Sequence, residues 1–273
     1  MIRRRNMKIA IVTGASSGMG RETIIQLADR FGALDEIWAI ARREDRLQEL
    51  KSQVPVKLRT FALDLCEEQA LQTLEAALEE EKPQVRFLVN AAGFGKIGPV
   101  GSLTLKDELG MVRLNCESLC GVTHVVLPYM PDHSRIIQYA SSAAFLPQPK
   151  FAIYAATKSF VLSYSRALHM ELKPRDIAVT AVCPGPVKTE FFEIAEGTGK
   201  IPLYKQVAMA DPKKVVKLAI RDSMMGKTVS VYGILMKLFR LLSKCFPHEW
   251  ILAGMDAVGL TCANSDWEKF DRW

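Results

Sequence analysis

Short apolar runs alternate with longer segments of mixed polarity along the first two thirds of the chain. Runs without polar–apolar alternation are typical of parallel strands that are covered on both faces. Seven strands are predicted, at residues 8–13, 36–41, 56–63, 85–90, 135–139, 177–183 and 228–232. Helical spacing of apolar residues predicts helices at 21–31, from Arg43 to about 53, at 67–81, at about 104–130, around Tyr154 and Lys158 up to Pro174, and from Asp211 onward. This alternation predicts an α/β fold, with one Rossmann-like, doubly wound parallel sheet flanked by helices.

One domain is predicted for residues 1–273, with a core at about 7–232 and no repeat or linker. After Thr189 the alternation weakens, and residues 190–210 combine aromatic residues with glycines in a pattern expected of a substrate lid. A helical C-terminal extension, 233–273, contains an apolar stretch with scattered Lys and Arg at 233–258. That stretch could form an oligomer contact, cover a substrate pocket or touch a membrane surface. We favour these three interpretations in that order.

The composition is that of an ordinary globular protein, with 49% hydrophobic and 24% charged residues. The net charge of +6 is spread along the sequence, and the compact basic cluster Arg3-Arg4-Arg5 is better explained as a solvated arm than as a nucleic-acid site. Six Cys and four His lack the spacing of a metal site or a disulfide framework. No secretory segment and no run of about 18 apolar residues is present. We therefore expect a soluble cytoplasmic protein without a metal or a nucleic-acid partner.

A glycine-rich turn, Gly14-Ala-Ser-Ser-Gly-Met-Gly20, follows the first strand and opens the first helix. This context predicts phosphate binding, because glycines allow close backbone approach and a helix N-terminus offers unpaired N–H groups. Glycines also serve plain turns, and the spacing differs from the commoner G-x-G-x-x-G pattern. The residues predicted to hold a dinucleotide here are Gly14, Ser16, Ser17, Gly18, Met19 and Gly20.

The charge after the second strand indicates which dinucleotide is bound. In a Rossmann unit, an acidic residue about 20 positions after the glycine loop binds the ribose 2′-hydroxyl, whereas an Arg accommodates a 2′-phosphate. Ala41 occupies that region here, and Arg42 and Arg43 follow it. Because an Arg pairs with a phosphate that an Asp would repel, NADP(H) is predicted rather than NAD(H). The alternative is a solvated pair of arginines that opens a helix.

Tyr154 and Lys158 are four residues apart, which places them one turn apart on one face of a predicted helix. A Tyr has a pKa of about 10 and is a poor acid–base catalyst near neutral pH. A fixed cation nearby stabilises the phenolate and lowers that pKa toward a useful range. Such pairs also occur on ordinary helices, so the catalytic interpretation depends on the other motifs.

Together these motifs resemble the short-chain dehydrogenase/reductase family, and they appear in the family's order. The matching pieces are residues 13–20, Asp64, Asn90-Ala-Ala-Gly93, Asn115, Ser141, Tyr154-x-x-x-Lys158 and Pro184-Gly-Pro-Val-x-Thr189. Met19 stands where the family usually has Ile. Ser141 is preferred to its neighbour Ser142 because it lies 13 residues before Tyr154, the family's usual separation.

The resemblance implies a role for each of these residues. Tyr154 is expected to be the general acid in carbonyl reduction and the base in alcohol oxidation, while Lys158 lowers its pKa and holds the nicotinamide ribose. Ser141 is expected to hydrogen-bond the substrate oxygen, and Asn115 to support a water-linked proton path to Lys158. The resemblance also assigns cofactor contacts to Asp64, Leu65, Asn90, Ala91, Gly93, Pro184, Val187 and Thr189. Asp64 could instead be a plain helix cap.

The predicted function is therefore NADP(H)-dependent interconversion of a ketone or aldehyde and an alcohol. The apolar content of 190–210 and of the extension favours an apolar or hydroxysteroid-like carbonyl substrate. A 3-oxoacyl-carrier-protein reductase is an alternative within the same chemistry. A regulatory protein that binds NADP without catalysis is an alternative from another class. A homodimer or homotetramer is expected, and the sequence leaves the substrate and the reaction direction open.

Overall fold

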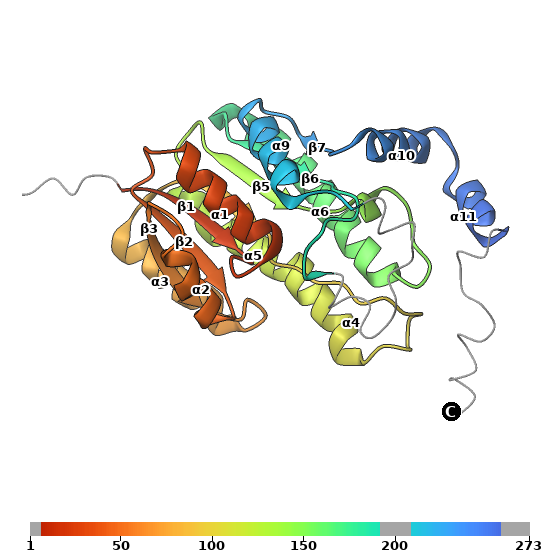
Figure 1. The fold of residues 1–273 in the computed structure, drawn as a ribbon, viewed down its shortest axis with the longest axis horizontal. Helices are drawn as coiled ribbons and strands as arrows, with labels where there is room; N and C mark the ends of the chain where they lie inside the picture. The colour runs from red at the N-terminus through yellow and green to blue at the C-terminus, as the bar shows by residue number, and fades with distance from the viewer. Residues whose placement is uncertain (1–6, 192–208, 258–273) are drawn as a thin grey trace, which may run out of the picture.

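The computed structural model describes residues 7–191 and 209–257, which are arranged around one parallel sheet (Figure 1). The strands lie in the order β3-β2-β1-β4-β5-β6-β7. Their bounds are β1 (Lys8–Thr13), β2 (Glu36–Ala41), β3 (Lys57–Ala62), β4 (Gln84–Asn90), β5 (Arg135–Tyr139), β6 (Ala178–Val182) and β7 (Val229–Ser230). The strand order reverses direction between β1 and β4, and this switch point is where open α/β sheets bind ligands.

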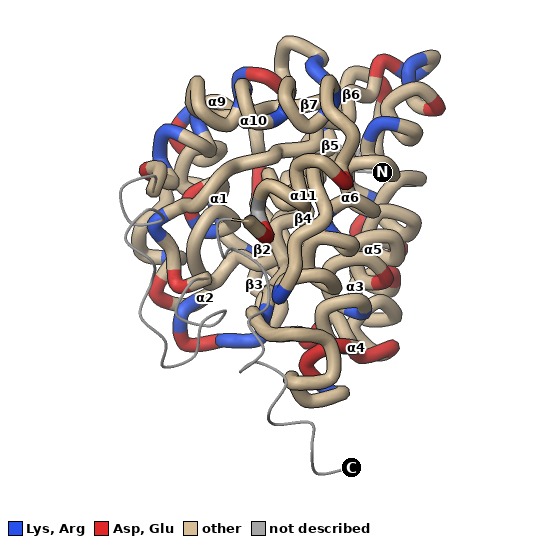
Figure 2. The backbone as a smooth tube through the Cα atoms, turned by 90° about the vertical axis from the view of Figure 1, so that its right-hand side faces the viewer, with Lys and Arg blue, Asp and Glu red and all other residues tan. Residues whose placement is uncertain are grey.

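Helices cover both faces of the sheet, as the predicted doubly wound fold requires (Figure 1). Their bounds are α1 (Gly18–Arg30), α2 (Glu44–Lys51), α3 (Glu68–Glu81), α4 (Leu105–Val112), α5 (Ser118–Val126), α6 (Ala152–Glu171), α9 (Pro212–Met224), α10 (Ile234–Cys245) and α11 (His248–Ala257). Charged residues lie mainly on these helices and on loops (Figure 2).

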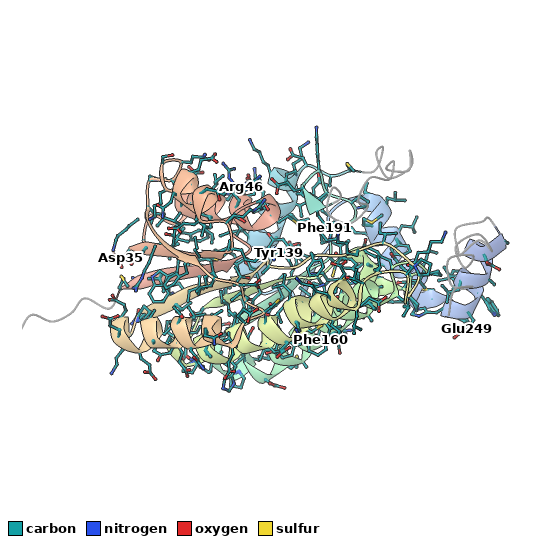
Figure 3. All side chains as sticks on the ribbon, turned by 90° about the horizontal axis from the view of Figure 1, so that it is seen from below. Asp35, Arg46, Tyr139, Phe160, Phe191 and Glu249 are labelled. Atoms are coloured by element: carbon teal, nitrogen blue, oxygen red, sulfur yellow. The ribbon has the colours of Figure 1, made fainter. Side chains whose placement is uncertain are left out.

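The sheet divides the core into two apolar layers, because successive strand residues point to opposite faces. In β1, Ala10 and Val12 pack with residues of α1, α2 and α9. Ile9 and Ile11 point the other way and pack with residues of α3, α5 and α6. All four are fully buried, and Figure 3 shows helices on both sides of the strands. The prediction of strands covered on both faces is confirmed.

Two predicted elements differ from the structure. The strand predicted at 228–232 is shortened in the structure to β7, Val229–Ser230. The helix predicted at 104–130 is divided into α4, a π-helical turn at Arg113–Glu117, α5 and a 3-10 turn at Leu127–Tyr129. In this turn the backbone amide and the hydroxyl of Ser118 both donate to the carbonyl of Arg113, and the Asn115 side chain donates to the carbonyl of Phe94.

The last described helices, α10 and α11, project from one end of the molecule (Figures 1 and 3). α10 contacts the body through the short 3-10 turn at Ser142–Phe145. Most of the predicted lid, residues 192–208, lies outside the described part of the chain. Among the described helices, none combines the length and apolarity that crossing a bilayer demands.

Candidate active site at the carboxyl ends of the strands

A cleft of about 660 Å³ opens at the carboxyl ends of β1 to β4, above the switch point of the sheet. Its size is in the range of small-molecule and cofactor sites. The predicted residues that line it are Gly14, Ser16, Ser17, Gly18, Met19, Gly20, Arg42, Arg43, Asp64, Leu65, Ala91, Gly93, Tyr154, Lys158 and Thr189. Motifs far apart in the sequence therefore meet in one place.

The glycine loop has a backbone that side chains would obstruct. Gly14 has φ +67°, and a Cβ there would lie 2.7 Å from the backbone of Ala91. A Cβ on Gly20 would lie 2.3 Å from the carbonyl oxygen of Gly14. α1 begins at Gly18, and the side chain of Ser17 does not cap it. The first backbone amides of α1 therefore receive no hydrogen bond acceptor from that side chain. These features fit the pyrophosphate of a dinucleotide.

Arg43 extends from the end of β2 to the glycine loop. Its guanidinium donates to the hydroxyl of Ser17 at 2.8 Å and to that of Ser16 at 3.2 Å. It also pairs with the carboxylate of Glu190 at 3.0 Å, and Arg46 pairs with the same carboxylate. These arginines lower the pKa of Glu190, chiefly through the hydrogen bond from Arg46. The carboxylate of Glu190 is therefore an anion already bound by the guanidinium groups of Arg43 and Arg46.

Arg42, the first of the two arginines predicted at the 2′-phosphate, lines the cleft but, within the described residues, forms no hydrogen bond with the glycine loop. Its side chain is 71% exposed and forms a long ion pair of 3.8 Å with Asp64. Asp64 also accepts a hydrogen bond from the backbone of Cys66 at 3.0 Å, as a turn residue does. Both residues line the cleft, but Arg43 is the arginine held against the loop.

Tyr154 lies on α6 with its side chain buried. Burial raises its pKa above the ordinary value of 10, and a hydrogen bond with Ser141 acts in the opposite direction. Ser141 precedes the 3-10 turn, and its hydroxyl also accepts from the amide of Ala143 at 3.1 Å. The preferred serine is therefore the one that reaches the phenol.

Lys158 lies one helical turn beyond Tyr154, and its ammonium is 5.6 Å from the centre of the Tyr154 ring. The ammonium donates to the backbone carbonyl of Tyr139 at 2.8 Å. Burial lowers the pKa of Lys158 to about 8. A Cβ on Gly93 would lie 3.3 Å from this nitrogen, so the glycine of the Asn-Ala-Ala-Gly motif leaves room for it.

Asn115 lies in the π-helical turn and is almost fully buried. Its side chain holds the loop after β4, because it donates to the carbonyl of Phe94 at 2.9 Å and accepts from the amide of Phe94 at 3.1 Å. It also donates to the hydroxyl of Thr157, next to Lys158 on α6, at 3.0 Å. The π-helical turn thus places Asn115 between the loop that follows β4 and α6.

Comparison with known proteins identifies the family. The short chain dehydrogenase family model matches residues 8–197. The chain is 31% identical over 232 residues to sulfoacetaldehyde reductase 2 of Chromohalobacter salexigens, which covers 82% of this chain and 91% of that protein. The protein belongs to the short-chain dehydrogenase family. As a member of this family it is an oxidoreductase of alcohol and carbonyl groups.

Two further comparisons agree with this assignment. The chain is 30% identical over 222 residues to the human very-long-chain 3-oxoacyl-CoA reductase, which covers 78% of this chain and 67% of that protein. The structure is similar to the closed form of serine dehydrogenase complexed with NADP+, with a TM-score of 0.68 and 27% identity over 81% of this chain and 93% of that one. The parallel sheet and its flanking helices are thus those of the short-chain dehydrogenases.

Three of the predicted cofactor contacts do not line the cleft of this short-chain dehydrogenase. The Asn90 side chain is buried and donates to the hydroxyl of Thr123 at 3.0 Å, which joins β4 to α5. Pro184 accepts from the amide of Ser142 at 2.8 Å, and Val187 forms a bridge with Ala210. These contacts hold the loops around the cleft in place.

Several residues of the site were not predicted from the sequence. Phe151 stacks on Tyr154 with ring centres 4.2 Å apart, and Phe191 lies 5.4 Å from the same ring. Figure 3 shows Phe191 and Arg46 toward one face of the molecule and Tyr139 in its interior. Arg46 is three residues after Arg43 on the predicted helix, so helical spacing was a usable signal for it. No comparable signal existed for Glu190, which is 147 residues from Arg43 in sequence.

Among the described residues, no cluster of His, Cys, Asp or Glu has the arrangement of a metal site. Cys116 and Cys183 lie near Lys158, and burial raises the pKa of their thiols to about 11 and about 12. Both thiols are therefore neutral near pH 7, and Lys158 is the charged group beside Tyr154.

Proposed function

We propose that this short-chain dehydrogenase is an NADP(H)-dependent enzyme that interconverts an apolar carbonyl compound and its alcohol. The observation that carries the proposal is the buried Tyr154 phenol, hydrogen-bonded to Ser141 and one turn from Lys158, at the end of a cleft shaped for a dinucleotide. NADP(H), when bound, supplies or accepts the hydride, and the chain's own residues hold the substrate and move the proton.

In carbonyl reduction, Tyr154 donates its phenolic proton to the substrate oxygen. Its raised pKa keeps the phenol protonated at neutral pH, which suits this direction. Ser141 donates a hydrogen bond to the same oxygen as negative charge develops there. Lys158, with a pKa of about 8, is mostly cationic at pH 7 and stabilises the phenolate that remains. In alcohol oxidation the same groups act in reverse.

Asn115 acts by position. Its bonds to Phe94 and Thr157 hold the loop that carries Gly93 and the helix that carries Lys158 at a fixed separation. We propose that Asn115 supports a water-linked proton path to Lys158, through which the Tyr154 phenolate regains its proton after reduction, as the resemblance to the family implies.

The preference for NADP(H) follows from the arginines at the end of β2. Arg43 contacts both loop serines and holds the Glu190 carboxylate, so a 2′-phosphate would find matched donors there. The test measures kcat/KM with NADPH and NADH for the wild type, Arg43→Ala and Arg42→Ala. Arg43→Ala should lower kcat/KM for NADPH about tenfold or more without a comparable change for NADH. The side chain of Arg42 is mostly exposed, so Arg42→Ala should lower kcat/KM for NADPH less than Arg43→Ala does. Equal turnover with NADH in the wild type would contradict the assigned preference.

The substrate is proposed to be apolar because aromatic rings surround the proton donor. Phe151 and Phe191 contact the Tyr154 ring, and Phe94 and Met111 pack in the same cluster. A panel of alicyclic, aromatic and fatty ketones and alcohols, followed at the nicotinamide absorbance, tests this class. Turnover limited to small polar aldehydes would contradict it.

A 3-oxoacyl thioester is the second candidate substrate. Lys96, Lys106 and Arg113 line the cleft and would suit an acidic carrier, and a curated relative is named for reduction of a 3-oxoacyl-CoA. The panel therefore includes 3-oxoacyl-CoA and 3-oxoacyl-carrier-protein substrates. A regulatory protein that only binds NADP would show binding and no turnover with the whole panel.

We also propose a homo-oligomer, whose contacts include the outer surfaces of α4 and α6. Leu109 and Val112 of α4 and Phe160 of α6 are exposed apolar residues, and the two helices pack against each other. Light scattering of the purified chain tests this proposal. We further propose that residues 1–273 form a single cofactor-binding domain with its core at about 7–232.

A further inference from the structure

α10 carries apolar residues on two opposite sides, and its inner side alone explains its attachment to the fold. Met236 lies against Gly185, and the rings of Phe239 and Phe145 are 6.3 Å apart. Ser243, on the same side, is buried. The helix is thus anchored by residues that face the body of the protein.

The outer side of α10 is apolar as well, although it faces solvent. Helical spacing brings five residues together on this side, and all five are exposed: Ile234, Leu235, Leu238, Leu241 and Leu242. Ile234 has 85% of its surface accessible, and Trp250 of the adjoining α11 has 70%. An exposed apolar surface of this extent marks an interaction site. We call these five residues the outer face of α10.

The charged residues of α10 have one sign, and Glu249 is the first acidic residue that follows them, on α11. Residues 223–248 include no Asp or Glu, whereas α10 contains Lys237, Arg240 and Lys244. Lys237 and Lys244 are exposed and seven residues apart, so they flank the outer face on the same side. Arg240 is turned inward, with its guanidinium 5.9 Å from the Phe145 ring.

This charge distribution argues against a second copy of the chain as the occupant of the face. A symmetric contact between two outer faces would bring together the lysines of two copies of α10, and α10 contains no carboxylate to offset them, since Glu249 lies on α11. An anionic lipid surface matches both the apolar residues and the lysines. At 12 residues α10 is too short to span a bilayer, which takes about 20, so it would lie in the surface plane.

We propose that α10, together with Trp250 of α11, is an anchor that binds the surface of an anionic phospholipid bilayer. The outer face enters the headgroup region, the lysines contact lipid phosphates, and the exposed indole lies at the interface where Trp is favoured. The anchor does not depend on the proposed catalytic function. Because the inner side of α10 contacts Gly185 and Phe145, the anchored protein holds the segments that follow Ser141 and Pro184 close to the membrane.

The experiment is co-sedimentation of the full-length chain with vesicles. Two compositions are compared, phosphatidylcholine alone and equal parts of phosphatidylcholine and phosphatidylglycerol. The variants are Leu238→Glu/Leu241→Glu, which charges the outer face, and Lys237→Gln/Lys244→Gln, which removes its flanking charge. Met225→Glu is the matched control, because Met225 is an exposed apolar residue outside α10. All altered side chains are exposed, and circular dichroism confirms that each variant is folded.

We expect the wild type and Met225→Glu to bind the anionic vesicles, more weakly at higher salt, and to bind the neutral ones far less. The Lys variant should bind about 30-fold more weakly, at about fivefold for each lysine near an anionic surface. The Leu variant should lose binding. No sedimentation of the wild type with anionic vesicles would overturn the proposal, as would unchanged binding of the Leu variant. A wild-type oligomer that dissociates in the Leu variant, measured by light scattering without lipid, would assign the face to a second copy instead.

Discussion

Replacing Lys158 should make the protein more stable while it removes activity. The ammonium is fully buried, and burial lowers its pKa from the ordinary 10.5 to about 8. At 1.36 kcal/mol for each pKa unit, the folded state pays about 3 kcal/mol to keep this lysine charged. Lys158→Met removes that cost and also the hydrogen bond to the carbonyl of Tyr139, which contributes about 1 kcal/mol. The variant should therefore be about 2 kcal/mol more stable than the wild type at pH 7.

The pH dependence gives the sign of the effect. Because the folded pKa is below the unfolded one, the unfolded state binds more protons between about pH 8 and pH 10.5. The cost is fully present below pH 8, and the stability of the wild type should recover as pH rises through this window. The charge of Lys158 lowers the pKa of the Cys116 and Cys183 thiols, so the difference between the two unfolding free energies contains Lys158 together with its coupling to these thiols.

Urea unfolding of both proteins at several pH values from 7 to 10 measures this difference. The advantage of Lys158→Met should shrink as pH rises, while its turnover stays at background throughout. Two parallel stability curves, or a variant less stable than the wild type at pH 7, would refute the assignment of a charged, desolvated lysine beside Tyr154.

Three further substitutions test the site. Tyr154→Phe should lower kcat by about 10²- to 10⁴-fold, the usual contribution of a proton donor, and leave NADPH binding by fluorescence unchanged; near-normal turnover would exclude Tyr154 as the donor. Glu190→Gln removes the carboxylate charge that is paired with Arg43. The Kd for NADPH should therefore fall about fivefold, as expected for a partly exposed ion pair, while the Kd for NADH stays constant. An unchanged ratio of the two Kd values would count against the 2′-phosphate site. Gly14→Ala places a Cβ 2.7 Å from the Ala91 backbone at a positive φ. The free energy of unfolding should therefore fall by at least about 1 kcal/mol, and calorimetry should detect no cofactor binding. A variant as stable as the wild type would show that the loop is not held as described.

The fold could be predicted from the sequence because its signals are local. A strand buried on both faces, such as β1, appears as a continuous apolar run, and the structure confirms that its residues pack into both layers. The pairing of Tyr154 with Lys158 needed only the spacing of a helix, and α6 supplies it. Gly14 could be assigned to a tight turn because few other residues accept its backbone conformation.

The parts that could not be predicted depend on side-chain direction and on contacts distant in sequence. Two adjacent arginines follow β2, and the sequence does not show which one turns toward the glycine loop. The structure assigns that position to Arg43, whereas Arg42 pairs with Asp64. The π-helical turn at Asn115 was hidden for a related reason, since it depends on hydrogen bonds with Phe94, on a different loop.

Under the proposed function, the carboxylate of Glu190 would affect which cofactor binds. A group tethered to the chain competes with any incoming anion at a high effective concentration, whatever the cofactor level in solution. A 2′-phosphate carries more negative charge than a carboxylate and, under the proposed function, would displace it from Arg43, whereas the hydroxyl of NADH has no charge with which to compete. Glu190 would thus act as an intramolecular competitor that a cofactor must displace from Arg43 in order to bind. It lies shortly before residues 192–208 in the chain. Arrival of the phosphate would release that segment from its attachment to α2.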